Sequence, residues 1–141
     1  MIDSFRNEYS FLSNFYETPI YYDGLLYNST EAAFQAQKCK YQEEKKLFCK
    51  MTPSKAKQYG RKVDLVENWE EKKDKIMFDI CFIKFSLNKE LKIKLLKTGN
   101  EELVEGNTWN DCYWGVCKGK GLNKLGKILM SIRTILKERD S

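Results

Sequence analysis

Histidine is absent from the chain, and with it the side chain that most often acts as a general base or metal ligand near neutral pH. The sequence also lacks any run of about 18 apolar residues, the length needed to span a membrane. Its first residues, Met1–Arg6, lack the basic and then apolar pattern of a signal peptide. We therefore expect no membrane segment, and any enzymatic chemistry must rest on carboxylates and amines.

Arginine is scarce as well: only four of the 25 basic residues are arginines, against 20 acidic residues and a formal net charge of +5. The lysines alternate with glutamates along segments that have helical periodicity. This pattern is typical of solvated helix faces rather than of a nucleic-acid-binding stripe. The charge indicates only a weak attraction to phosphate-bearing ligands.

Cysteine is present but has no metal-binding pattern. The five cysteines are odd in number, and no C-x-x-C pair occurs. Without histidine, a zinc site would need four thiolates from scattered positions, so no metal site is expected. We therefore expect the thiols to be reduced, as they are in the cytoplasm, and we expect a cytoplasmic protein. Cys81, between Ile80 and Phe82, is expected to be a core residue.

Length and pattern predict one domain over residues 1–141, able to bury roughly two-thirds of the surface of the unfolded chain. The dipeptide Asp23-Gly24 between two apolar runs predicts a hairpin over 20–27. Capping residues and apolar periodicity predict helices over 28–38, 42–50, 53–60, 69–87, 89–98 and 123–137. A short strand is expected over 103–105. The fold class is α+β, mainly α-helical with a small β element.

In the longest predicted helix, an apolar stripe is expected to face the core, formed by Ile76, Ile80, Ile83 and Leu87 with Met77 beside it.

The segment Asn28–Lys38 carries an acid, an amide and an amine. In a helix Glu31, Gln35 and Lys38 share one face, because residues four and seven apart lie at nearly the same azimuth. An ionisable pair on a partly buried helix is costly unless it is paired or used, which raises the question of a functional role. The structural alternative is an N-cap at Asn28 with Glu31 reaching back to it, and a solvated Lys38.

Residues 106–126 hold five of the eight glycines and little predicted secondary structure. Such a stretch inside a compact domain is more often functional than idle. Trp109 and Trp114 offer flat faces there, and Asp111 offers a carboxylate. Residues 119–121 precede a predicted helix, where backbone N–H groups can approach a phosphate. Core anchoring of the tryptophans and a solvent-exposed turn are the structural alternatives.

Together these pieces resemble the NADAR, or YbiA-like, family, named for its association with NAD and ADP-ribose metabolism. The matching blocks run in order along the chain: Leu12–Phe15, Asp23-Gly24, Ser29–Glu31, Phe34–Lys38, Gly60-Arg61, Asn68–Glu70, Met77, Lys84-Phe85, Leu103–Glu105, Asp111, Tyr113–Gly115, Gly119–Gly121, Asn123, Leu125-Gly126, Leu129-Met130 and Arg133. One departure is Ala32, where many members of the family have histidine.

The resemblance implies a YbiA-like fold and an enzyme that hydrolyses N-glycosidic bonds, an N-glycosidase or ADP-ribosyl glycohydrolase. Some relatives cleave ribosylaminopyrimidine intermediates of riboflavin synthesis, and others remove ADP-ribose from guanine. The expected partner is thus a small nucleotide or an ADP-ribosylated nucleobase, with nucleic acid only as a modified substrate. Nothing in this chemistry needs a metal or another cofactor. The alternative function is a non-catalytic module that senses ADP-ribose or a related nucleotide.

Carried over position by position, the resemblance implies a catalytic group formed by Glu31, Lys38, Asp111 and Trp69. It implies a substrate-binding group formed by Asn14, Phe15, Gln35, Arg61, Trp114, Gly115 and Asn123. We expect Glu31, Lys38, Trp69, Asp111 and Trp114 to border one pocket.

An N-glycosidic bond breaks through an oxocarbenium-like state, so the site must stabilise positive charge and help the base to leave. Two mechanisms can do this. Glu31 and Asp111 can divide leaving-group protonation and stabilisation of the cation. Alternatively, a neutral Lys38 amine captures C1 of the sugar as an imine, which requires burial or a nearby cation to lower its pKa. In either route Trp69 and Trp114 can stack on the base or on adenine.

Overall fold

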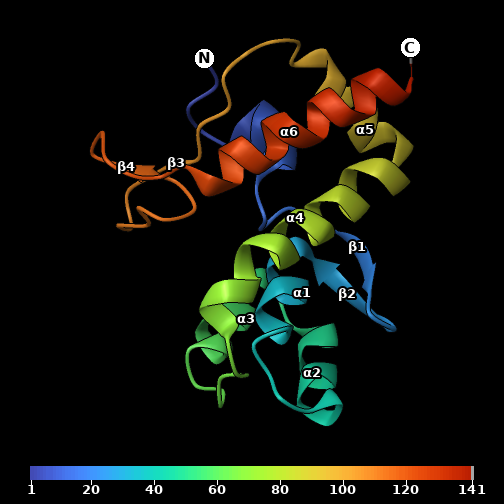
Figure 1. Cartoon of the computed structure of the whole chain (residues 1–141), viewed down its shortest axis with the longest axis vertical. Helices are drawn as coiled ribbons and strands as arrows, with labels where there is room; N and C mark the ends of the chain where they lie inside the picture. Colours follow the sequence, from blue (N-terminus) through green and yellow to red (C-terminus); the bar gives the residue numbers. More distant parts are fainter. Residues whose placement is uncertain (141) are drawn as a thin grey trace. The chain divides into compact units, whose positions relative to one another are not determined.

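The computed structural model describes residues 1–140, which form two compact units drawn in Figure 1. The central unit comprises Asn14–Lys84, and the terminal unit comprises Met1–Ser13 together with the chain from Phe85 onward. Both units are mainly helical with a small β element, so the α+β class is confirmed. No helix in the described part of the chain is long and apolar enough to span a bilayer.

A two-stranded antiparallel hairpin opens the central unit. Strand β1 (Glu17–Tyr22) pairs with β2 (Leu25–Ser29), with Tyr22 opposite Leu25. Asp23 and Gly24 connect the strands, and their φ values of 49° and 85° are both left-handed. This is the turn that the Asp-Gly dipeptide predicts, since such turns match the twist of the two strands.

Helix α1 (Thr30–Ala36) follows β2 directly and is shorter than the predicted helix. Its N-cap is Ser29 rather than Asn28, because Asn28 still belongs to β2 and the Ser29 hydroxyl accepts from the Ala32 N–H at 3.1 Å. Beyond its end the chain straightens: Cys39 forms an isolated bridge with Leu65. The expected helical face therefore includes Glu31 and Gln35 but does not extend to Lys38.

The remaining helices of the central unit match their predicted ranges closely. They are α2 (Gln42–Leu47), the short 3₁₀ turn η2 (Phe48–Lys50), α3 (Pro53–Gly60) and α4 (Trp69–Leu87), whose last three residues belong to the terminal unit. Helix α3 begins as predicted, with Thr52 as N-cap accepting from the Lys55 N–H and a proline at the first position.

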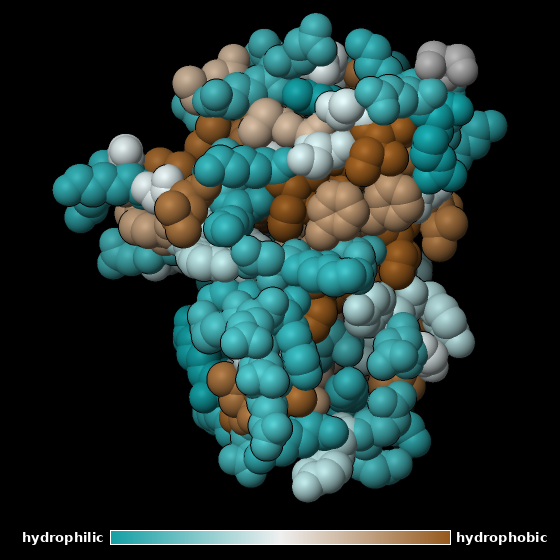
Figure 2. Space-filling model, in the orientation of Figure 1, coloured by the Kyte–Doolittle hydropathy of each residue, from teal (hydrophilic) through white to brown (hydrophobic). Residues whose placement is uncertain are grey.

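The buried face of α4 differs from the predicted stripe. Met77, Ile80, Cys81, Lys84 and Phe85 are buried. Ile76 and Ile83 are only half-buried, and Leu87 is 78% exposed. Cys81 is a core residue as expected, whereas the buried face includes a lysine that an apolar pattern cannot reveal. Figure 2 shows apolar side chains at the surface over α4.

The terminal unit joins the two ends of the described chain. It contains the 3₁₀ helix η1 (Asn7–Leu12), α5 (Lys89–Lys97), two short strands and α6 (Lys124–Arg139). Asn88 caps α5 as predicted. The predicted apolar positions of α6 are buried: Leu125, Leu129, Ile132 and Leu136.

The strand predicted over 103–105 is wrong. Leu103 makes only an isolated parallel bridge with Ile2. The regular pairing starts one residue later, between β3 (Gly106–Asn107) and β4 (Val116–Cys117), which run parallel. The apolar pair Leu103-Val104 is therefore explained by contact with the N-terminal segment rather than by a sheet.

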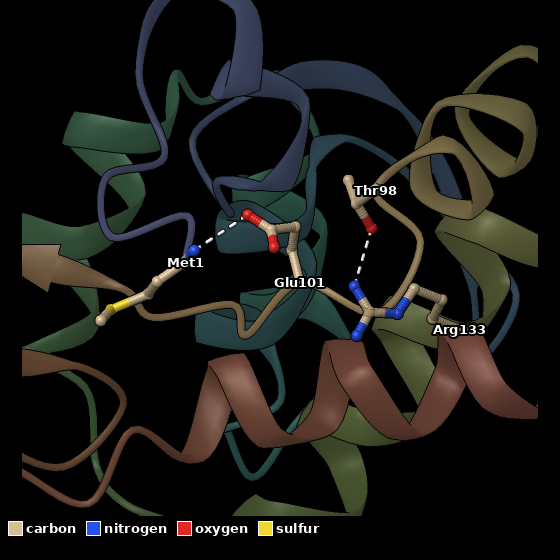
Figure 3. Close-up of polar contacts among 4 residues, drawn as sticks. All are labelled: Met1, Thr98, Glu101 and Arg133. Carbon is tan, nitrogen blue, oxygen red and sulfur yellow. Dashed lines mark hydrogen bonds and ion pairs between the residues drawn. The ribbon is translucent and has the colours of Figure 1, made fainter.

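Two polar contacts in the terminal unit, one buried and one exposed, involve α6 and the N-terminal segment (Figure 3). Arg133 of α6 is buried and donates to the Thr98 hydroxyl at 2.8 Å, just after α5. The amino group of Met1 forms an ion pair with Glu101 at 2.9 Å.

Candidate functional site

Glu31 lies in the first turn of α1, where its backbone N–H donates to the Asn14 carbonyl at 3.0 Å. Its side chain is buried, and Oε2 accepts from the Gln35 amide Nε2 at 2.7 Å. A carboxylate in the first turn of a helix also benefits from the N-terminal end of the helix dipole. The structure thus holds Glu31 in one orientation.

Gln35 is enclosed at both ends of its amide. Nε2 contacts Glu31, and Oε1 lies so close to Gly60 of α3 that a Cβ atom there would come within 2.0 Å of it. Among residues 1–140, Oε1 has no hydrogen-bond partner. Gln35, predicted to bind substrate, is therefore in direct contact with the predicted catalytic carboxylate.

Lys38 lies just beyond α1 and is half-buried. Burial lowers the pKa of its amine; the charge of Glu31 opposes that shift, and the nearby Arg61 guanidinium adds to it. Arg61 itself is exposed at the end of α3. The sequence-based condition for a reactive amine, a pKa below its ordinary value, is met by burial first and by a neighbouring cation second.

Asn14 and Phe15 precede β1. The buried Asn14 side chain donates to the Met77 sulfur at 3.5 Å and accepts from the Cys81 thiol at 4.0 Å, which fixes it against α4. Phe15 is 39% exposed, with the Lys57 ammonium 5.7 Å from its ring centre. Phe15 thus has an accessible aromatic surface, whereas Asn14 is a rigid link between α4 and Glu31.

Trp69 begins α4 and is only 5% exposed. Its ring packs on Phe34 of α1 at 5.2 Å between ring centres, tilted by 52°. This contact anchors Trp69 in the core and orients α4 against α1.

Lys84 was missed as a site candidate. It is 2% exposed, burial lowers the pKa of its amine to about 8, and its Nζ lies 5.6 Å from the centre of the Tyr16 ring. It lies on the same face of α4 as Met77 and Cys81, the two residues that hold Asn14. Only its place in the Lys84-Phe85 motif could have singled it out in the sequence.

In the terminal unit, Asp111 organises a tight loop. Its Oδ1 accepts from the backbone N–H groups of Tyr113 and Trp114 at 3.1 and 2.9 Å. Asn107 bonds both the N–H and the carbonyl of Asp111, at 3.0 and 2.9 Å. One oxygen of the predicted catalytic carboxylate is thus used to shape the loop.

Three further predicted residues surround this loop. Trp114 is half-buried and packs edge to face on Tyr113 at 4.9 Å. Gly115 leaves no room for a side chain, because a Cβ there would lie 2.1 Å from the Glu105 carbonyl. Asn123 bonds the Glu105 N–H and the Leu103 carbonyl, both at 3.0 Å.

The start of α6 is closed off by the same loop. The N–H groups of residues 122–125 donate to the carbonyls of residues 112–115 at 2.8–3.2 Å. Residues 117–120 form a tight turn in which Lys118 and Gly119 have left-handed φ values of 53° and 76°. The donors of residues 122–125 are thus engaged by the chain itself. Of the N–H groups of residues 119–121, that of Lys120 donates to the Cys117 carbonyl at 3.1 Å, and a phosphate contact of this segment stays a prediction.

The structure thus gathers the predicted residues into two groups. Asn14, Phe15, Glu31, Gln35, Lys38, Arg61 and Trp69 belong to the central unit, and Asp111, Trp114, Gly115 and Asn123 belong to the terminal unit. That both groups border one pocket remains a prediction. Within residues 1–140, no cluster of three or more cysteines or acidic residues is arranged to hold a metal ion.

Comparison with known proteins identifies the family of the chain. The family model of the NADAR domain matches residues 3–137. The N-glycosidase YbiA of Escherichia coli is 40% identical over 136 residues, covering 92% of this chain and 83% of YbiA. The N-glycosidase Npun_R5314 of Nostoc punctiforme is 35% identical, over 89% of this chain and 84% of that protein.

Two further similarities extend the comparison. The riboflavin biosynthesis protein VVA0006 of Vibrio vulnificus is 33% identical over 92% of this chain, which matches 36% of that longer protein. The NMR structure of E. coli YbiA superimposes with a TM-score of 0.85 and 35% identity, over 99% of this chain and 89% of that one. The chain belongs to the NADAR family. Within that family it is an enzyme of the N-glycosidase class.

Proposed function

We propose that this N-glycosidase cleaves the bond between C1 of a ribose, carried as ADP-ribose or ribose phosphate, and the nitrogen of a nucleobase-like amine. The candidate substrates are ADP-ribosyl-guanine and a phosphorylated ribosylaminopyrimidine. The second is favoured by similarity to a protein named for riboflavin biosynthesis. The family resemblance supports both.

One observation carries the proposal: an amine with a lowered pKa lies near a buried carboxylate. Burial shifts Lys38 toward its neutral form, and Glu31 is close enough for its charge to act on Lys38. A neutral amine is the nucleophile that an imine mechanism needs, and a carboxylate beside it can carry protons.

In this mechanism, the Lys38 Nζ lone pair forms a bond to C1 while the bond from C1 to the base nitrogen breaks. The leaving nitrogen takes the bonding electrons and a proton, delivered through Glu31 from the attacking amine. The C1–O bond of the ring then opens to give an imine, and the ring oxygen gains the second proton of Nζ. Water adds to the imine carbon and releases the sugar and the free amine.

The two-carboxylate route remains the alternative mechanism. There Glu31 protonates the leaving nitrogen, and Asp111 stabilises the cation or activates water. Because Asp111 Oδ1 already accepts two backbone N–H groups, only the other oxygen of this carboxylate is open to such a role.

Borohydride trapping distinguishes the two mechanisms. Turnover of ADP-ribosyl-guanine or of the ribosylaminopyrimidine in the presence of borohydride is expected to leave a stable ribosyl adduct on Lys38, located by peptide mass mapping. Lys38→Ala is expected to abolish the adduct and most of the turnover. The matched control is Lys40→Ala, an exposed lysine two residues away, which is expected to keep both.

Each outcome has a distinct meaning. Near-normal turnover by Lys38→Ala would refute the imine at this residue, and an adduct on Lys84 would move the nucleophile to α4. Glu31→Gln is expected to lower the rate by a factor of about 10²–10⁴, because it removes proton transfer but preserves shape. Binding of both substrates without release of free base would instead identify a nucleotide sensor.

A further inference from the structure

We propose that Gln35 is a positioning residue for Glu31 and that Gly60 locks it in place. The Gln35 amide fixes the plane of the carboxylate and thereby the direction in which its second oxygen faces the substrate. The inference rests on the proposed function, since it assigns Gln35 a task in the proton transfer given to Glu31.

The contact between the two side chains is short and lies within one helix. Gln35 is four residues after Glu31, so the two side chains stack along one face of α1. The distance of 2.7 Å from Nε2 to Oε2 is at the short end for an N–H donor, as expected when the acceptor is charged. With both residues buried, solvent competes little with this bond.

Gly60 lies against the oxygen end of the Gln35 amide. A Cβ atom at position 60 would lie 2.0 Å from Gln35 Oε1 and 2.9 Å from its Cδ, so only glycine leaves room for the amide in this position. The residue ends α3, and its φ lies outside the left-handed range, so its backbone does not itself require glycine. The absence of a side chain at Gly60 is therefore explained by the position of Gln35.

Stability alone does not account for a glutamine at this position. Its Oε1 is buried without a hydrogen-bond partner among the described residues, which costs free energy that an apolar side chain of the same length would avoid. The amide nitrogen is the part of Gln35 that an apolar residue lacks, and its acceptor is Glu31.

The charges that act on Lys38, the amine near Glu31, come from α3 and α4 as well as from Glu31 itself. Arg61 follows α3, and Glu70 and Lys73 lie in the first turns of α4. Removing the Gln35 donor leaves these charges in place. A change in the titration of Glu31 in a Gln35 variant therefore reports on the lost hydrogen bond.

The test replaces Gln35 by methionine, which has the same length but no donor. Turnover of ADP-ribosyl-guanine or of the ribosylaminopyrimidine is expected to show a kcat lower by about 10- to 100-fold with little change in KM, since loss of an orienting contact disturbs the reaction geometry. The acidic limb of the pH–rate profile is expected to move to higher pH, because a carboxylate that loses a donor holds its proton more tightly.

The matched control is Gln37→Met. Gln37 is buried to the same extent, and its Nε2 also donates a hydrogen bond, at 2.9 Å, but to the Ala33 carbonyl. If Gln37→Met shifts the pH profile as much as Gln35→Met does, or if Gln35→Met leaves kcat and the profile unchanged, the positioning role is refuted.

Gly60→Ala tests the lock itself. It is expected to lower kcat in the wild-type background, where the new methyl group displaces the amide. In a Gln35→Ala background its effect is expected to be much smaller, because the amide group is gone and only the Cβ of residue 35, 3.3 Å from the new methyl group, remains. Equal effects in the two backgrounds would contradict the contact between the two positions.

A readout without substrate separates this inference from the proposed function. The Glu31 carboxyl is titrated by ¹³C NMR in the wild type and in Gln35→Met, with Glu31→Gln to assign the signal. A shift to higher pH with an inactive wild type would support the contact and refute the proposed substrates. Loss of activity in Glu31→Gln, without any change of the Glu31 titration in Gln35→Met, would support the proposed function and refute the positioning role of Gln35.

Discussion

A buried amine such as Lys84 lowers the stability of the folded protein as long as it carries a proton. Burial lowers the pKa of Lys84 from 10.5 to about 8, and the Tyr16 ring supplies part of the missing solvation. A shift of one unit corresponds to about 1.4 kcal/mol. The charged amine therefore opposes folding at neutral pH by up to about 3 kcal/mol.

Lys84→Met is accordingly expected to raise the free energy of unfolding at pH 7. Between pH 8 and 10.5 the unfolded state binds the proton that the folded state has lost, so the wild type gains stability as the pH rises through this window. The difference in free energy of unfolding between Lys84→Met and the wild type should therefore become smaller between pH 8 and 10.5. Urea unfolding at pH 7 and pH 10 measures it, with the exposed Lys72→Met as control; a pH-independent difference would refute the assignment.

Residue identities in the site could be predicted only in part. The segment around Glu31 was recognisable, because an acid and an amide four residues apart on an alanine-rich helix form an unusual pattern. The enclosure of Gln35 by Gly60 was not recognisable, since it depends on how α3 packs on α1. Burial of Lys84 was missed for the same reason: the periodicity of α4 marks apolar residues, not a lysine among them.

At the level of elements, helix caps carry much of the local information. Asn88 Oδ1 accepts from the Leu91 N–H at 3.1 Å and satisfies one of the free donors that begin α5. Such a cap is readable from sequence, because a polar side chain precedes an amphipathic run.

Asn88→Ala is expected to lower the free energy of unfolding by about 1 kcal/mol, because it leaves this donor without its side-chain acceptor. Asn88→Asp is the control and should retain most of the stability, since its carboxylate accepts the same bond. Chemical denaturation of the three proteins measures the effect. Equal losses for alanine and aspartate would show that the cap bond contributes nothing.

Caps also explain where helix starts differ from the predicted ones. Asn28 and Ser29 are both good caps, and the choice between them depends on β2 continuing through Asn28. Asn123 precedes α6 in a left-handed conformation, with its side chain turned to Leu103 and Glu105 instead of the helix. Tertiary contacts decided both cases.

For the molecule as a whole, the single-domain prediction is still to be tested. The two units share α4, which contributes Trp69–Lys84 to the central unit and Phe85–Leu87 to the terminal unit. A continuous helix favours cooperative unfolding, because melting its middle removes buried residues from both units.

We therefore expect one unfolding transition. Tryptophan fluorescence reports separately on each unit: Trp69→Phe leaves only the two tryptophans of the terminal unit, and the double variant Trp109→Phe/Trp114→Phe leaves only Trp69. For each variant, the urea midpoint measured by tryptophan fluorescence should coincide with the midpoint measured by circular dichroism. The comparison within one variant corrects for its own stability. Separate midpoints would show two independently folding parts.

The bridge between Ile2 and Leu103 has a consequence for how the protein is made. On the ribosome, residues 14–84 are complete before Glu102 and Leu103 are added, so the central unit can begin to fold first. The N-terminal segment must meanwhile wait without its pairing partners, and closing this long loop is slow. The last part of the fold to form during synthesis is thus expected to include Ile2, although Ile2 is translated before every residue of the central unit.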